Sequence, residues 1–248
     1  MSILNINLKQ LHLSAFIQYY EIYARDAAAN NQTYEQYLQA LTLEEINTRS
    51  KNRVKRLIKT ANFAFERSIS RFKFKEVPQL KEKEILSLAQ CSYIDKHENI
   101  CFIGHPGAGK THLAVSLGLE ACKKKYSVLF YNAAELVNVM IEAQSKFELS
   151  KLQTKLKKVQ LLIIDELGYI PFSKDGAELL FQLFASRYEQ GSTIITTNLE
   201  FPDWTKFMID PTMTAALLDR LTHHCHIFSM IVDKSYRFKE SMRKNDKI

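Results

Sequence analysis

The sequence has few of the features that mark secreted, membrane-spanning or disulfide-bonded proteins. No stretch of eighteen consecutive apolar residues occurs, and the N-terminus has no cationic region followed by an unbroken apolar core. The cysteines stand far apart with no CxxC pair among them: Cys91, Cys101, Cys122 and Cys225. This spacing is not that of a disulfide framework or a zinc knuckle, and it favours a reducing compartment. We therefore expect a cytoplasmic protein that does not enter a membrane.

Glycine and proline are absent from residues 1–75. Apolar residues recur there at helical spacing, so we expect a small all-α domain over this range. Within it, Thr33 is followed three residues later by Gln36, which is the spacing of a capping box. The pattern predicts a short helix over 34–41 and another over 43–64.

Acidic residues are nearly absent from one segment of that domain. Glu66 is the one carboxylate between Arg49 and Lys75, in a chain whose formal net charge is +7. A run of a single charge sign favours binding of a phosphate backbone, and a solvated helix face is the alternative. We expect the domain over residues 1–75 to serve DNA binding or oligomerisation. Its candidate DNA-binding residues are Arg49, Lys51, Arg53, Lys55, Arg56 and Lys59.

From residue 76 the pattern changes to short apolar runs that alternate with helical stretches. This alternation predicts an α/β domain over residues 76–248, with a parallel five-stranded sheet covered by helices on both faces. The expected strands are 100–103, 128–131, 161–164, 193–196 and 227–232. The expected helices are 110–122, 134–146, 177–190 and 212–223. Because few residues follow Val232, we expect no C-terminal helical lid.

The first expected strand ends in GHPGAGKTHLA, which contains the GxxxxGKT pattern of a phosphate-binding loop. Glycines let the backbone turn so that its N–H groups face phosphate oxygens, and the positive end of the following helix points to the same place. Lys110 can reach the β and γ phosphates, and the hydroxyl of Thr111 can hold Mg²⁺. We therefore expect ATP and Mg²⁺ as ligands, bound through Gly104, Gly107, Ala108, Gly109, Lys110, Thr111 and His112.

The third expected strand runs directly into two adjacent carboxylates, Asp165 and Glu166. We expect this strand to lie next to the strand of the phosphate-binding loop, so that Asp165 and Thr111 share the bound Mg²⁺. Glu166 would then be free to polarise the attacking water as a base. The alternative is that Asp165 begins a helix as its N-cap residue.

Two further polar residues lie where hydrolysis would need them. Asn198 ends the strand pattern TIITTN, so its amide is expected at the same edge of the sheet as the loop, where it can orient water. An ordinary turn residue is the alternative for Asn198. Arg220 is a candidate arginine finger that completes the ATP site of a neighbouring subunit, and a structural salt bridge is its alternative.

Four segments together resemble a known family: GHPGAGKTHLA, LLIIDELGYIPF, ELLFQLFASRYEQGSTIITTNLEFPDW, and AALLDRLTHHCHIF followed by SYRFK. They are similar to the IstB-like ATP-binding proteins, the helper ATPases of bacterial insertion sequences. These are relatives of the DnaC helicase loader within the initiator group of AAA+ ATPases. The resemblance implies a homo-oligomer, with nucleotide at subunit interfaces, that assembles non-specifically on double-stranded DNA in the bacterial nucleoid. It would deform the target DNA and recruit or stimulate a partner transposase.

The resemblance also implies roles for individual residues. Lys110 and Thr111 correspond to Walker A, Asp165 and Glu166 to Walker B, Asn198 to sensor 1, Arg220 to the finger supplied in trans, and Arg237 to the sensor 2 arginine. Initiator relatives insert a helix after the second strand, and residues 133–158 are long enough for it. Lysines at the end of that segment could face a DNA duplex, and a solvated surface helix is the alternative. They are Lys151, Lys155, Lys157 and Lys158.

Other functions fit less well. A DnaC-like helicase loader is the nearest alternative, because its ATPase core would be the same and only the partner would differ. A small-molecule kinase would need arginines in a mobile segment after the third strand, and a structural DNA-bending protein would not need both carboxylates. The run His223-His224-Cys225-His226 contains metal ligands, but we expect no metal there because no carboxylate partner or second ligand pair is evident. Trp204 is expected to be a packed anchor.

Overall fold

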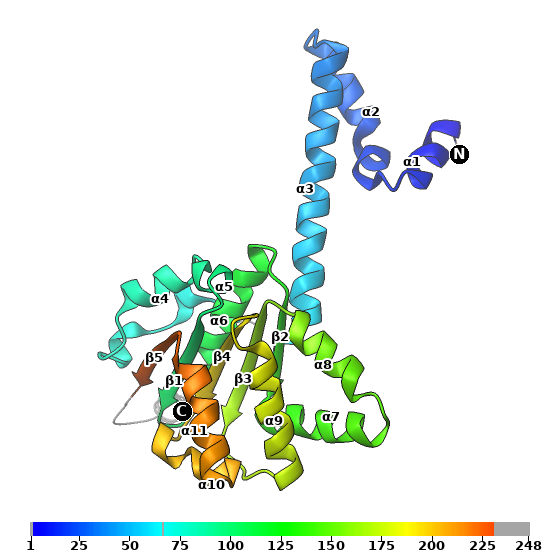
Figure 1. Ribbon diagram of the computed structural model, residues 1–248. Helices are drawn as coiled ribbons and strands as arrows, with labels where there is room; N and C mark the ends of the chain where they lie inside the picture. The colour runs from blue at the N-terminus through cyan, green and yellow to red at the C-terminus, as the bar shows by residue number, and fades with distance from the viewer. Residues whose placement is uncertain (1, 66, 231–248) are drawn as a thin grey trace, which may run out of the picture. The chain divides into compact units, whose positions relative to one another are not determined.

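The computed structural model of the chain describes residues 2–65 and 67–230, which form two compact units (Figure 1). The second unit begins at Leu57, whereas the sequence predicted a division at residues 75/76. The division comes earlier because Leu57 and Phe63 pack against the hydrophobic core of the second unit.

The first unit is helical. Its helices are α1 (Ile3–Gln10), α2 (Ser14–Ala29) and the N-terminal part of α3 (Tyr34–Ala61). The predicted capping box opens α3, because the Thr33 N–H donates to Gln36 Oε1 at 2.9 Å and the Gln36 N–H donates to Thr33 Oγ1 at 3.2 Å. The predicted break near residue 42 is wrong. The two predicted helices form one, because α3 runs without a break from Tyr34 to Ala61. Within it, Thr42 donates its hydroxyl to the Gln39 carbonyl.

One buried carboxylate, Glu45, ties α3 to the rest of this unit. Glu45 Oε2 accepts the Ala15 N–H at 2.7 Å, and Glu45 Oε1 accepts Arg49 Nε at 2.7 Å. Burial opposes the ionisation of Glu45, but these hydrogen bonds hold its pKa below the usual value. Arg49 also donates to the His12 carbonyl at 2.8 Å, so this candidate DNA-binding residue has a structural role as well.

The second unit is built on a parallel sheet, which confirms the predicted fold class. Within the described residues its strands are β1 (Asn99–Gly104), β2 (Val128–Asn132), β3 (Leu161–Leu167), β4 (Ser192–Thr197) and β5 (Cys225–Met230). Their order across the sheet is β2-β3-β4-β1-β5, and each neighbouring pair is parallel. This order corrects one expectation, because β3 is not next to β1: β4 lies between them. The last two residues of the predicted fifth strand lie outside the described residues.

Helices cover both faces of this sheet, as Figure 1 shows. Alternate residues of β1 enter different cores: Phe102 packs on the side of α6 (Lys110–Lys123), and Ile103 packs on the side of α9 (Lys174–Arg187). The predicted insertion after β2 forms two helices, α7 (Ala133–Ser145) and α8 (Leu149–Lys158). The other helical segments are η1 (Ile69–Arg71), η2 (Phe74–Glu76), α4 (Glu82–Leu88), α5 (Ser92–Asp95), η3 (Phe201–Trp204), α10 (Thr205–Met208) and α11 (Pro211–Thr222).

Three smaller expectations can be set against this fold. Trp204 is fully buried and donates Nε1–H to the Leu199 carbonyl at 3.3 Å, which confirms that it is a packed anchor. No helix in the described ranges is long and apolar enough to cross a membrane. The absence of a helical lid after β5 and the sensor 2 role of Arg237 concern residues outside the described part of the chain.

Candidate nucleotide-binding site

The phosphate-binding loop joins the carboxyl end of β1 to the first turn of α6. Gly104 has φ +151° and Gly109 has φ +96°, in the region that side chains disfavour. Space is also short at both positions. A Cβ on Gly104 would lie 2.1 Å from the Met230 carbonyl oxygen, and a Cβ on Gly109 would lie 2.6 Å from the Phe72 ring. Both glycines are therefore required by the local fold.

Lys110, the first residue of α6, is buried against this loop. Its ammonium donates to the Gly104 carbonyl at 2.7 Å and to the His105 carbonyl at 2.9 Å. These contacts hold the positive charge at the mouth of the loop, beside the N-terminus of α6. The loop and Lys110 together can therefore bind the phosphate groups of a nucleotide.

Asp165 lies at the centre of a buried network of oxygen atoms. Its Oδ1 accepts hydrogen bonds from the Thr111 hydroxyl at 2.8 Å and from the Thr196 hydroxyl at 2.5 Å. Burial raises the pKa of Asp165, and these two hydrogen bonds and the charge of Lys110 oppose that rise. Carboxylate and hydroxyl oxygens are ligands that suit Mg²⁺. The predicted pair, Thr111 and Asp165, is thus brought together across the intervening strand β4.

The neighbouring carboxylate, Glu166, points to a different partner. Its Oε2 accepts Asn132 Nδ2–H at 2.9 Å, and Asn132 Oδ1 in turn accepts the Ala134 N–H at the start of α7. Glu166 has φ +60°, an uncommon value for a residue with a side chain. The alternative role of Asp165 as a helix N-cap is wrong, because β3 continues to Leu167 and the following helix, α9, is capped by the Ser173 hydroxyl.

Thr196 and Asn132 are site residues that the sequence analysis missed. Thr196 is fully buried in β4, where its Oγ1 also accepts the Glu166 N–H at 2.9 Å. The predicted residue Asn198 lies just beyond the end of β4 and is exposed. Asn132 ends β2 and Thr196 is the second-last residue of β4, so both lie near the carboxyl edge of the sheet, and that position was the signal available in the sequence.

Two clefts flank the loop. The larger, of about 950 Å³, is lined by Lys110, Thr111, Glu166 and Thr196, with Arg67 and Tyr169 at its border. The smaller, of about 520 Å³, lies between the loop and the segment before α4. Its lining residues are Arg67, Arg71, Phe72, Lys73, Glu76, Val77, Gly107, Ala108, Gly109 and His112. The larger cleft thus has the polar groups for phosphates. The smaller combines charged side chains with the apolar and aromatic surface of Phe72, Val77 and Ala108, on which a base could pack.

His112, predicted to contact the nucleotide, borders both clefts. Its Nε2 lies 2.9 Å from the Ser68 carbonyl, and its ring meets the Phe72 ring edge-on with the centroids 5.4 Å apart. Burial lowers the pKa of His112, which favours the neutral imidazole. His112 therefore holds the segment before α4 against α6 beside the clefts.

Arg220 lies in α11, at the opposite end of the sheet from the loop. It shares a small cleft with Asn99, the first residue of β1, and Thr193, the second residue of β4. The guanidinium donates to the Ala216 carbonyl at 2.7 Å and stands over the Phe181 ring. In the described part of the chain it forms no ion pair, so the predicted alternative of a structural salt bridge is not found there.

The candidate DNA-binding lysines of α8 are all exposed, while Leu156 of the same helix is buried. In α3, the candidate basic residues from Arg49 to Lys59 are exposed too. Exposure leaves these cations available to phosphates, but it is equally the property of a solvated helix face.

Comparisons with known proteins agree with this geometry. The sequence model of one family, described as IstB-like ATP binding protein, matches residues 6–244. The chain is 36% identical over 238 residues to the ATP-binding protein of insertion sequence IS5376 from Geobacillus stearothermophilus, covering 96% of this chain and 94% of that protein.

Two solved structures share the fold. DnaA from Aquifex aeolicus, bound to AMPPCP, matches with a TM-score of 0.59 and 20% identity, over 75% of this chain. That match spans 56% of the DnaA chain, little more than half its length. The DnaC helicase loader matches with a TM-score of 0.50 and 21% identity, over 70% of this chain and 98% of the loader. These likenesses confirm the P-loop AAA+ fold.

Proposed function

Because the chain belongs to the family of IstB-like ATP binding proteins, we propose that it is a Mg²⁺-dependent ATPase that acts in the transposition of an insertion sequence. ATP would assemble the chain into a homo-oligomer on double-stranded DNA, and the assembly would deform the DNA and recruit or stimulate a partner transposase. The observation that carries the proposal is the joint contact of Asp165 with Thr111 and Thr196, which holds the Asp165 carboxylate and the Thr111 hydroxyl together beside the phosphate-binding loop.

The nucleotide would bind along the two clefts. Backbone N–H groups of the loop and the Lys110 ammonium would hold the phosphates in the larger cleft. The base would enter the smaller cleft, between Phe72 and the loop. Thr111 and Asp165 would hold Mg²⁺, whose charge stabilises the β and γ phosphates. Metal binding would also favour the ionised form of Asp165, against the effect of burial.

Hydrolysis would depend on Glu166 as the residue that polarises water. Its carboxylate borders the larger cleft, and the Asn132 amide holds one of its oxygens at 2.9 Å. Asn132 is therefore a positioning residue, which sets the direction of Glu166 and does not itself touch the nucleotide. Asn198 remains the predicted second group for orienting water.

Arg220 would act on the nucleotide of a neighbouring subunit. Its place at the amino end of the sheet, opposite the loop of its own chain, supports a role in trans. Stabilisation of transition-state charge by such a finger is worth about 10³ to 10⁵ in rate where it operates. Hydrolysis would then require an assembled oligomer.

DNA would be bound through phosphates and without sequence preference. The exposed lysines of α8 and the exposed basic residues of α3 supply the charge. Contacts to phosphates position a protein on DNA but do not read bases. We therefore expect affinity for DNA to fall steeply as salt rises, for any duplex sequence.

The test is to measure ATP hydrolysis and particle size by light scattering, with and without a random-sequence duplex. Wild type should form large particles when ATP and DNA are both present, and DNA should raise its turnover. Glu166→Gln should bind ATP and assemble without hydrolysing it. A monomeric wild type whose turnover ignores DNA would contradict the proposal.

A helicase loader is the second candidate, because the fold is similar to that of the DnaC loader. The ATPase measurements above do not separate it from the first. Co-sedimentation with the transposase of the same insertion sequence, and separately with a replicative helicase, does. Binding of the helicase alone would favour the loader. A kinase remains disfavoured, since residues 168–176 contain no arginine to clamp a transferred phosphate.

A further inference from the structure

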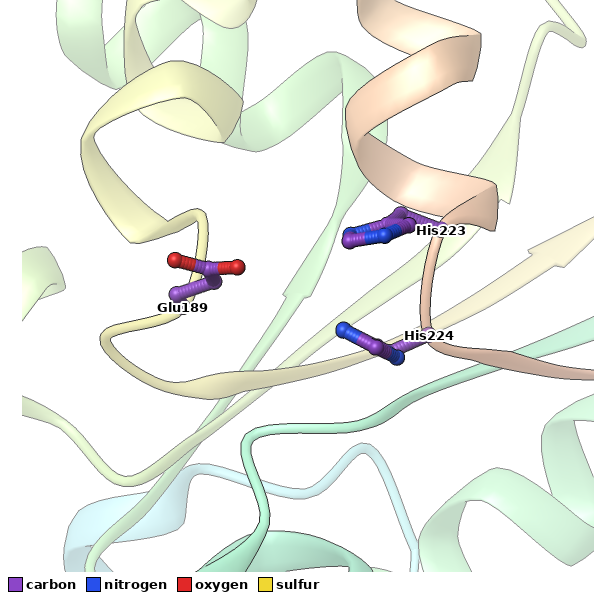
Figure 2. A group of neighbouring side chains, drawn as sticks. All are labelled: Glu189, His223 and His224. Atoms are coloured by element: carbon purple, nitrogen blue, oxygen red, sulfur yellow. The ribbon is translucent and has the colours of Figure 1, made fainter.

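Two histidines at the end of α11 lie beside a carboxylate that follows α9 (Figure 2). The ligand atoms of Glu189, His223 and His224 all lie within 4.8 Å of one another, and all three residues are exposed. Figure 2 shows both imidazole rings on one side of a gap and the carboxylate on the other. From the sequence alone no metal is expected at these histidines, because no carboxylate partner or second ligand pair is evident near them in the chain. The fold supplies that carboxylate from a distant part of the chain.

The orientation of His223 also suits a metal ligand. Its Nδ1 lies 2.8 Å from the hydroxyl of Tyr188, the residue before Glu189. When Nδ1–H donates to that hydroxyl, Nε2 keeps its lone pair for a metal ion. Histidines that bind metals usually have such a partner on their second nitrogen. One short segment thus supplies both the carboxylate and the group that fixes the ring.

The other two residues of the run belong elsewhere. His226 Nε2 lies 2.9 Å from a carboxylate oxygen of Glu98, with which it can form an ion pair. Cys225 packs against the core beneath the sheet, and its thiol donates to the His226 carbonyl at 3.8 Å, so it is not part of the cluster. The ligand set is therefore two imidazole nitrogens and one carboxylate oxygen.

We propose that Glu189, His223 and His224 bind a divalent transition-metal ion of the zinc type, with water in the remaining position. Two histidines, one carboxylate and water form a tetrahedral set that Zn²⁺ accepts, with donors about 2.0 to 2.2 Å from the ion. Mg²⁺ is disfavoured because it prefers oxygen ligands. Glu189 and His224 are exposed, so their side chains can rotate to bring their donors to that distance around the fixed ring of His223.

A bound ion would join the end of α9 to the end of α11. Arg220 lies three residues before His223, about one helical turn away. The ion would therefore restrain the helix end that carries Arg220. Binding of the metal does not depend on the proposed ATPase function, and it can be measured without nucleotide.

The experiment is isothermal titration of the full chain with zinc chloride, in excess Mg²⁺ to occupy sites of oxygen ligands. Wild type should bind one ion at this cluster. Glu189→Gln and His224→Ala should each weaken binding by about tenfold or more, and Tyr188→Phe by about tenfold through the orientation of His223. The matched control is His226→Gln, which removes a neighbouring imidazole and should leave the affinity unchanged.

Co²⁺ titration followed by absorption spectroscopy gives a second readout. A site of nitrogen and oxygen ligands should give visible bands without strong sulfur-to-cobalt charge transfer. Circular dichroism checks that each variant is folded. The proposal is overturned if wild type does not bind zinc, if Glu189→Gln and His224→Ala bind as wild type does, or if the cobalt spectrum shows thiolate ligation.

Discussion

The two ends of the parallel sheet hold their polar groups in different ways. At the carboxyl end, Asp165 and Thr196 are buried and share a hydrogen bond, so their positions are fixed within one chain. At the amino end, Arg220 is partly exposed, and Glu189, His223 and His224 are exposed. The carboxyl end is a site preorganised by its own fold. The amino end presents groups whose partners, in our proposals, come from outside: a neighbouring nucleotide and a metal ion.

The largest effect is expected from removal of Arg220, which we propose acts on the nucleotide of another subunit. Arg220→Ala should reduce the rate of hydrolysis about 10³-fold or more, while nucleotide binding is retained. Nucleotide binding is retained because Arg220 lies at the opposite end of the sheet from the phosphate-binding loop of its own chain. Steady-state phosphate release and nucleotide titration measure the two quantities.

Mixing two inactive variants separates action in trans from action in cis. Arg220→Ala keeps an intact Glu166, and Glu166→Gln keeps an intact Arg220. Mixed oligomers therefore contain some complete sites and should recover part of the wild-type rate. If mixed particles form but stay inactive, Arg220 does not act on the nucleotide of a neighbouring subunit.

Arg187 is an exception at the amino end, because it is 2% exposed and its partners lie within the same chain. Its guanidinium donates to the carbonyls of Leu156, Val159 and Ser192 at 2.5, 2.9 and 2.6 Å. Burial lowers the pKa of Arg187 to about 10, which still leaves it charged at neutral pH. Arg187→Ala leaves three carbonyls without this donor, so we expect a loss of about 3 kcal/mol or more in the free energy of unfolding.

Chemical denaturation checks this value. Lys158→Ala is the control, because it removes an exposed cation at the end of the neighbouring helix α8 and should change stability by no more than about 0.5 kcal/mol. Equal midpoints for the two variants would show that the buried guanidinium does not hold the amino end together.

Sequence alone predicted the features that are local in the chain. The loop motif and the alternation of apolar runs with helical stretches located the strands closely, because both depend on short segments. Thr196 was missed because its contact with Asp165 depends on β4 lying between β1 and β3, which no single segment encodes. The sequence pointed to Asn198, two residues after Thr196, as the polar residue of this strand that faces the site. The cluster of Glu189, His223 and His224 was missed for the same reason, since its carboxylate follows α9 and its histidines follow α11.

A smaller effect is expected from the positioning of Glu166. Asn132→Ser keeps a side chain that can cap α7, but serine is too short to reach Glu166. Loss of this charge-assisted hydrogen bond should lower kcat about tenfold, with little change in thermal stability or in nucleotide affinity. Rate measurements at saturating ATP, paired with nucleotide titration, decide the matter. A change in affinity without a change in kcat would show that Asn132 acts on binding.

The smallest expected effect concerns the pH dependence of the carboxyl end. Burial raises the pKa of Asp165, and the Thr196 hydroxyl opposes that rise, so Thr196→Val should raise this pKa further. Only the ionised carboxylate can hold a cation. As the pH falls, Thr196→Val should therefore lose activity at a higher pH than wild type does. The acid limb of its kcat/KM profile should shift upward by about one pH unit.

Thr197→Val is the matched control for that shift. Thr197 is equally buried in β4, but its hydroxyl donates to the Leu167 carbonyl at 2.8 Å and not to Asp165. Thr197→Val should lose stability, because the Leu167 carbonyl loses its donor and the Leu199 N–H loses its acceptor, yet it should leave the acid limb in place. If both variants show the wild-type limb, the Thr196 hydroxyl does not tune Asp165. Preorganisation of the carboxyl end would then have to come from Thr111 and Lys110.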